Sequence, residues 1–192
     1  MTGHMYHRKI SPPYFFPRSI SLGREGSDMK LFSVTILLLS IFCLSPTLAQ
    51  DEKLAAQHPL VTMADSIKVF ENGDQERAVF LYYVGQLRAR YWSLANNGTW
   101  KTSEEGALMS SLMSTVGPPI NRYAFGDLPR LRKTIDEVVE WDEKYPNKFC
   151  PKAENADARQ KVLDGLQKMR QMTIDQADHI REQRTKNGLK NR

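Results

Sequence analysis

One segment of the chain is too apolar for an ordinary surface helix, and it constrains the fold more than any other. It reads GDQERAVFLYYVGQLRARYW from Gly73 to Trp92. At about 100° per residue, its apolar side chains occupy two opposite sides of a helix, and its polar side chains fill only narrow sectors. A helix that is apolar on both sides is buried between partners. We therefore predict that residues 75–96 form the buried central helix of a small all-α domain.

The two sides of this predicted helix differ in bulk. Small residues at Ala78, Gly85 and Ala89 allow one neighbouring helix to approach closely. The opposite side carries large apolar residues that fill space against other neighbours, namely Phe80, Tyr83, Val84, Leu87, Tyr91 and Leu94. We expect most of the aromatic residues in this segment to belong to the core.

Two arginines, Arg88 and Arg90, lie on this nearly buried helix. A guanidinium group in such a place needs a carboxylate partner or an anionic ligand. An internal salt bridge to Asp127 or Glu137 is one expectation. The alternative is that Arg88 and Arg90 take part in binding a partner.

The rest of the chain also has helical periodicity, and no strand pattern is strong between about residues 61 and 186. Helix-start signals occur at Asp74, at Asp127 and in the capping-box pattern of residues 102–105. Residues 117–119, Gly-Pro-Pro, are expected to break a helix. The fold prediction is all-α with about five helices and a long C-terminal helix, at about 61–72, 75–96, 102–116, 128–144 and 154–186.

The first 49 residues are set apart from the fold. Residues 29–49 contain a lysine, an apolar run and small residues at Thr47 and Ala49, which is the pattern of a signal peptide cut before Gln50. We interpret residues 1–28 as an extension upstream of the true start. The alternative is an uncleaved inner-membrane anchor through residues 31–48, with residues 1–28 as a cytoplasmic tail. Both interpretations make residues 50–192 an exported domain, periplasmic or secreted.

Charge and motif content exclude several classes of function. The first 49 residues hold five of the 27 basic and two of the 22 acidic residues, so residues 50–192 carry a net charge of only +2. This balance does not indicate nucleic-acid binding. No zinc-ligand spacing, phosphate loop, dinucleotide motif or nucleophile elbow occurs, so no metal, cofactor or catalytic residue is predicted. Cys150 is the one cysteine after residue 49, so it is either buried and unreactive or paired between two chains, and we favour the first interpretation.

The turn at Gly73-Asp74, followed by Ala78, Tyr82 and Gly85, resembles the turn and second helix of a tetratricopeptide repeat. A weaker echo begins at residues 125–127, Phe-Gly-Asp, where the spacing does not repeat a 34-residue period. The resemblance implies helical hairpins of that type. The overall layout also resembles exported bacterial proteins of uncharacterised function.

A second candidate for partner binding is the segment from Val116 to Asp127, which two prolines stiffen. Together with the arginines above, it gives the predicted partner-binding set of Arg88, Arg90, Arg122, Tyr123 and Phe125. We expect a non-enzymatic module that binds a protein or peptide partner in the cell envelope, as a monomer or weak dimer. Alternatives are an inhibitor or immunity protein against a toxin or hydrolase, and a cell-envelope enzyme or accessory with a carboxylate site that the sequence does not locate.

Overall fold

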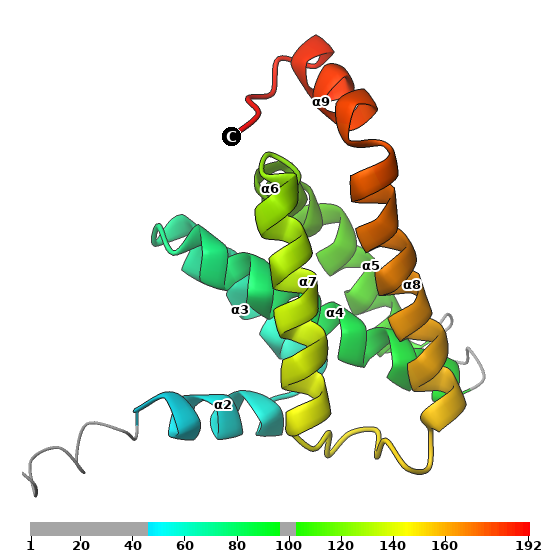
Figure 1. The fold of residues 1–192 in the computed structure, drawn as a ribbon. Coiled ribbons are helices and arrows are strands. Elements are labelled where there is room, and N and C mark those ends of the chain that lie inside the picture. The colour runs from blue at the N-terminus through cyan, green and yellow to red at the C-terminus, as the bar shows by residue number, and fades with distance from the viewer. Residues whose placement is uncertain (1–45, 97–102) are drawn as a thin grey trace, which may run out of the picture. The chain divides into compact units, whose positions relative to one another are not determined.

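The computed structural model describes residues 46–96 and 103–192, which form eight α-helices and no strands, so the all-α prediction is confirmed. The predicted extension and the apolar run of the leader lie outside these residues. Figure 1 shows the order of the helices along the chain, which are α2 (Pro46–Ala56), α3 (Pro59–Glu71), α4 (Gln75–Ala95), α5 (Glu104–Thr115), α6 (Gly117–Ala124), α7 (Leu128–Lys144), α8 (Ala156–Asp175) and α9 (Ala177–Lys186).

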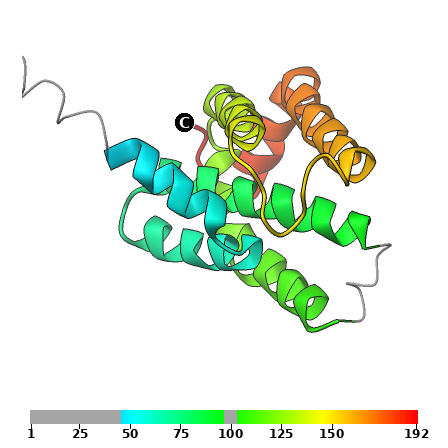
Figure 2. The ribbon, with the colours of Figure 1, turned by 90° about the horizontal axis from the view of Figure 1, so that it is seen from below.

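Helix α4 is the buried central helix that the sequence predicts. It packs against α3, α6, α7 and α8, and more than half of its residues are buried. Figure 2 shows α4 between α3 on one side and α7 with α8 on the other. The small residues do permit close approach, because a Cβ atom on Gly85 would lie 2.6 Å from Met63 Cγ and 2.7 Å from the Pro59 carbonyl oxygen.

The predicted helix starts are confirmed where a side-chain cap defines them. A carboxylate oxygen of Asp74 accepts from the Arg77 backbone N–H at 3.1 Å, and Asp127 accepts from the N–H of Arg130 at 3.0 Å. Ser103 Oγ accepts from the N–H of Gly106 at 3.2 Å. These caps satisfy N–H groups that the first turn of a helix leaves unpaired.

The predicted count of about five helices is too low. The predicted break at residues 117–119 does separate two helices, but Gly117–Ala124 itself forms helix α6 where no helix is predicted. Proline breaks a helix only after its first turn, because the first N–H groups need no partner within the helix. Pro118 and Pro119 therefore end α5 and also begin α6. Helix α2 is a further helix, and it begins inside the segment that was assigned to the leader.

The predicted C-terminal helix of residues 154–186 is interrupted at Gln176, which separates α8 from α9. Arg132 on α7 donates to the backbone carbonyl of Thr173 at 3.1 Å, and the Thr173 hydroxyl donates to the Arg170 carbonyl at 2.7 Å. Side chains that donate hydrogen bonds to backbone carbonyls of a helix are a common cause of such breaks. Helix α8 packs on α4 and α7, with Val162 and Leu166 in the core and Met169 partly buried against it.

A buried ion pair connects α4 to the rest of the domain. The Arg88 Nε atom donates to Asp142 on α7 at 2.9 Å, and the two side chains are 3% and 1% exposed. The other guanidinium nitrogens donate to the carbonyl of Ala55 in α2 and to that of Tyr145 after α7. Arg159 on α8 binds the second oxygen of Asp142, also at 2.9 Å. Four helices therefore meet at one carboxylate and one guanidinium.

This pair replaces the predicted salt bridge from α4 to Asp127 or Glu137. Asp127 caps α7 instead. Glu137 pairs with Arg130 and Lys133 on its own helix. The prediction of an internal salt bridge is therefore correct for Arg88, but its carboxylate partner is Asp142 and not Asp127 or Glu137.

Replacing Asp142 with asparagine should lower the free energy of unfolding by about 3–5 kcal/mol, because the buried charge of Arg88 loses its counter-ion. Chemical denaturation followed by circular dichroism measures this loss. The matched control is Asp136→Asn, which breaks a half-exposed pair with Arg170 and should cost about 0–1 kcal/mol. Similar losses in the two variants would contradict the structural role of Asp142.

Leu87→Ala should cost about 2–5 kcal/mol, because Leu87 is 1% exposed on the central helix and its truncation leaves a cavity. Leu94 lies on the same helix but is 47% exposed, so Leu94→Ala should cost less than about 1 kcal/mol. Denaturant titration of both variants checks the difference. A loss below about 1 kcal/mol for Leu87→Ala would mean that this side of α4 is not core.

Candidate functional site

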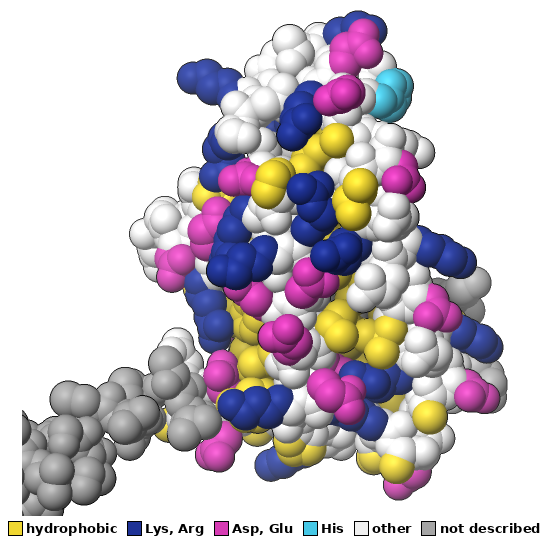
Figure 3. Space-filling view, in the orientation of Figure 1, with side chains coloured by type: hydrophobic (Ala, Val, Ile, Leu, Met, Phe, Trp, Pro, Cys, Tyr) yellow, Lys and Arg dark blue, Asp and Glu magenta, His cyan; other side chains and the backbone are white. Residues whose placement is uncertain are grey.

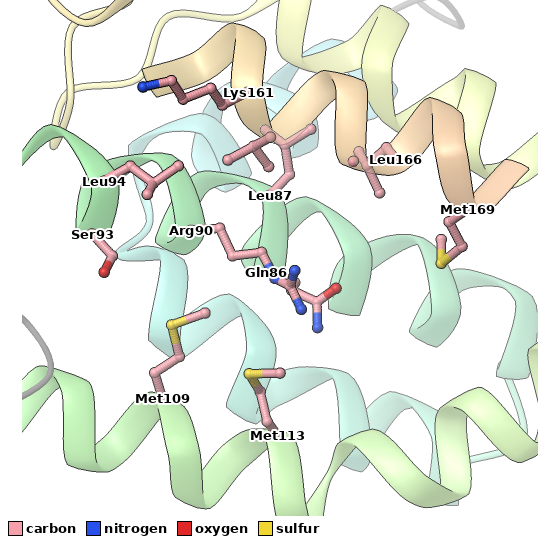
Figure 4. Close-up of a pocket in the computed structure, with 12 residues that line it drawn as sticks. Gln86, Leu87, Arg90, Ser93, Leu94, Met109, Met113, Lys161, Leu166 and Met169 are labelled. Carbon is pink, nitrogen blue, oxygen red and sulfur yellow. The ribbon is translucent and has the colours of Figure 1, made fainter. Parts of the chain in front are cut away.

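A groove with a volume of about 520 Å³ opens between α4, α5 and α8. Helix α4 forms its floor, and Met109 and Met113 of α5 face Leu166 and Met169 of α8 across it (Figure 4). The full lining is Gln86, Leu87, Arg90, Ser93, Leu94, Met109, Met113, Lys161, Val162, Gly165, Leu166 and Met169. The volume is within the usual range of ligand sites.

Arg90 is the charged group on the floor of this groove. Its side chain is exposed, and it forms no salt bridge or hydrogen bond with the part of the chain that the structure describes. Figure 4 shows its guanidinium group beside Gln86, within the groove. Lys161 on α8 is the other charged residue of the lining, and no carboxylate lines the groove among the described residues.

The two arginines of α4 therefore have different environments. Arg88 is 2% exposed and all three of its guanidinium nitrogens donate to internal acceptors. The face of that guanidinium lies over the Trp141 ring, 4.5 Å from its centre. All three nitrogens of Arg88 are thus bound inside the protein, whereas Arg90 donates to none of the described residues.

The other predicted binding residues lie at the opposite end of α4, around the turn between α6 and α7. The Tyr123 hydroxyl donates to Glu76 at 2.8 Å, and the Tyr123 ring packs against Phe70 and under the guanidinium of Arg192. Phe125 is half-buried against the core, and Arg122 is exposed. The structure does not bring Arg122, Tyr123 and Phe125 together with Arg90 in one site.

The walls of the groove were not predicted as a site from the sequence. Met109 and Met113 are four residues apart on one helix, so they share a face. Met113 is 38% exposed, and the spacing of the two methionines on α5 was the available signal. The positions that face it on α4 and α8 depend on how three helices meet, which no local pattern shows.

A second cleft of about 510 Å³ is lined by residues of α2, α4 and α7, and it contains the densest group of carboxylates. Most of them are paired, with Glu76 and Glu137 both bound to Arg130 at 2.6 and 3.2 Å. Burial favours the protonated form of Glu76, but the hydrogen bonds from Arg130 and Tyr123 outweigh it and lower the pKa of this carboxyl. A general acid needs a raised pKa, so Glu76 is suited to holding Arg130 rather than to donating a proton.

Cys150 is buried, and burial raises the pKa of its thiol, with the charge of Glu154 adding to the shift. An activated cysteine has a lowered pKa instead. The geometry therefore matches the expectation of an unreactive thiol. No group of His, Cys, Asp and Glu side chains able to hold a metal ion occurs among the described residues.

His58 occupies a structural position at the start of α3. Its Nδ1 atom accepts from the Leu60 N–H at 3.3 Å, and its ring contacts those of Trp92 and Phe149 edge to face. Burial lowers the pKa of His58 below its ordinary value of 6.5, and the charge of Glu105 opposes this shift. A protonated imidazole cannot accept the hydrogen bond that caps α3.

The lowered pKa of His58 predicts that stability falls on acidification. Below the ordinary value of 6.5 the unfolded chain binds a proton more readily than the folded one, so the free energy of unfolding decreases as the pH drops from 6.5 through the folded-state pKa. His58→Asn retains a capping side chain without a titrating group and should flatten this dependence. Denaturation midpoints measured across this range check it, with the exposed His179→Asn as control. An unchanged pH dependence in His58→Asn would exclude His58 as its source.

No model of a protein family, no curated protein and no solved structure matches the chain.

Proposed function

We propose that this chain is a non-enzymatic binding module that holds a protein or peptide partner in the groove between α4, α5 and α8. The observation that carries this proposal is Arg90, an exposed guanidinium that forms no salt bridge or hydrogen bond with the described residues and lies on the floor of a largely apolar groove. An arginine in such surroundings is suited to pairing with an acidic group of a bound molecule.

The apolar walls support the same proposal. Leu94 and Met113 remain 47% and 38% exposed although they line a concave surface beside other apolar residues. Single exposed apolar residues are ordinary, but a concave surface lined by several apolar residues with a few polar groups is typical of a binding site. Methionine is unbranched and polarizable, so the three methionines can adapt to apolar side chains of varied shape.

Two other classes of function have less support. Acid–base catalysis calls for carboxyl groups with separated pKa values, and in the second cleft Glu76 and Glu137 are bound to Arg130. Nucleic-acid binding calls for a basic surface. On the face of α7 and α8, basic and acidic side chains are interspersed (Figure 3).

The proposed setting is the cell envelope. It rests on the signal-peptide pattern of residues 29–49, and the periplasm or the medium is where residues 50–192 would act. None of the described helices is both long enough and apolar enough to cross a membrane.

Site-specific photo-crosslinking tests this function. A benzophenone amino acid at Met113, inside the groove, should yield one dominant crosslinked product in an envelope extract of the source cells. The same amino acid at Val61, which is 47% exposed on α3 outside the groove, is the control and should not yield it. The second variant Met113→Lys should weaken capture by about tenfold or more, because it places a charge against apolar walls.

Equal crosslinking from positions 61 and 113, or no product from either, would contradict the proposal. Thermal unfolding of each variant shows whether the fold is retained. Since Met113 is partly exposed, its replacement should change stability little.

A further inference from the structure

The groove has the dimensions of a site for one face of a short helix. Its lining on α4 extends from Gln86 to Leu94, and its lining on α8 extends from Lys161 to Met169. Each stretch rises about 12 Å at 1.5 Å per residue, which is a little over two helical turns. The α8 wall is open at Gly165, where even an added Cβ atom would have no neighbour within 4 Å.

The backbone chemistry of the walls favours a helical occupant over an extended one. The described residues contain no strand, so the groove offers no sheet edge to pair with an extended peptide. An extended peptide would place unpaired N–H and C=O groups against methionine and leucine side chains, at considerable cost. A helix satisfies these groups internally and presents only side chains to the groove.

The charged residues of the lining indicate the sign of the charge that a bound molecule should carry. Arg90 and Lys161 are both exposed and are the only charged residues of the lining, which contains no carboxylate among the described residues. Figure 4 places the guanidinium of Arg90 between the α5 and α8 walls and Lys161 toward one end. An acidic side chain of the occupant would therefore meet Arg90 without a competing carboxylate in the lining.

We propose that the groove binds an acidic amphipathic helix of the partner protein. Apolar side chains of that helix at positions i, i+4 and i+7 would contact Met109, Met113, Leu166 and Met169. A glutamate or aspartate on the same face pairs with Arg90 by charge-assisted hydrogen bonds. This inference rests on the proposed function and adds the secondary structure and the charge of the bound segment.

Two designed peptides test the inference on the full chain. Each has about 14 residues, roughly four helical turns, and the same leucine stripe at i, i+4 and i+7. One carries glutamate at the position facing Arg90 and the other carries lysine there. Fluorescence anisotropy should show the glutamate peptide binding about tenfold tighter or more, because the lysine peptide replaces attraction with repulsion.

The charge-reversal variant Arg90→Glu should invert this preference. The control is Arg122→Glu, which reverses an exposed arginine outside the groove and should leave the preference unchanged. Circular dichroism of both variants shows whether they are folded. Equal binding of the two peptides to the original chain, or a preference that survives in Arg90→Glu or is lost in Arg122→Glu, would overturn the inference.

The two proposals can fail separately. If residue 113 crosslinks a partner but neither peptide binds above a scrambled sequence, the groove is a binding site and the acidic-helix inference is wrong. If the crosslink is also absent, the proposed function is wrong as well.

Discussion

The buried ion pair between Arg88 and Asp142 is the interaction on which the arrangement of the helices depends. A buried charge is costly unless it is paired and fully hydrogen-bonded. Here the Arg88 guanidinium donates to Asp142 and to two backbone carbonyls, and Arg159 donates to the second carboxylate oxygen of Asp142. These contacts come from α2, α4, α7 and α8 and from the segment after α7. All are made together only when those elements hold their observed positions, so the network specifies their arrangement more than it adds stability.

The same helix that carries this network also provides the floor of the groove. Residues two apart on a helix point about 200° apart, so Arg88 and Arg90 lie on nearly opposite sides of α4. The side of Arg88 is covered by α7. The side of Arg90 lies between α5 and α8, which form the two walls of the groove above it. A helix that is apolar on both sides can thus be central to the core and still present one short stretch to a ligand.

The parts of the fold that depend on local sequence were predictable. Asp74 and Asp127 start helices because capping requires only a side chain and the N–H three residues later. The partner of Arg88 was not predictable, because Asp142 is 54 residues away and the register of α7 against α4 determines the pairing. The groove was missed for the same reason. It forms where three helices meet, and only the spacing of the two methionines on α5 indicated it.

The two arginines of α4 have separate environments: Arg88 is buried in the core, and Arg90 is exposed in the groove, where we propose that it binds a partner. Nuclear magnetic resonance of the arginine Nε–H groups tests this difference most directly, since hydrogen exchange reports burial and hydrogen bonding. The Arg88 Nε–H should exchange with solvent far more slowly than that of Arg90 and show contacts to the Trp141 ring. Equally fast exchange at Arg88 and Arg90 would contradict the account.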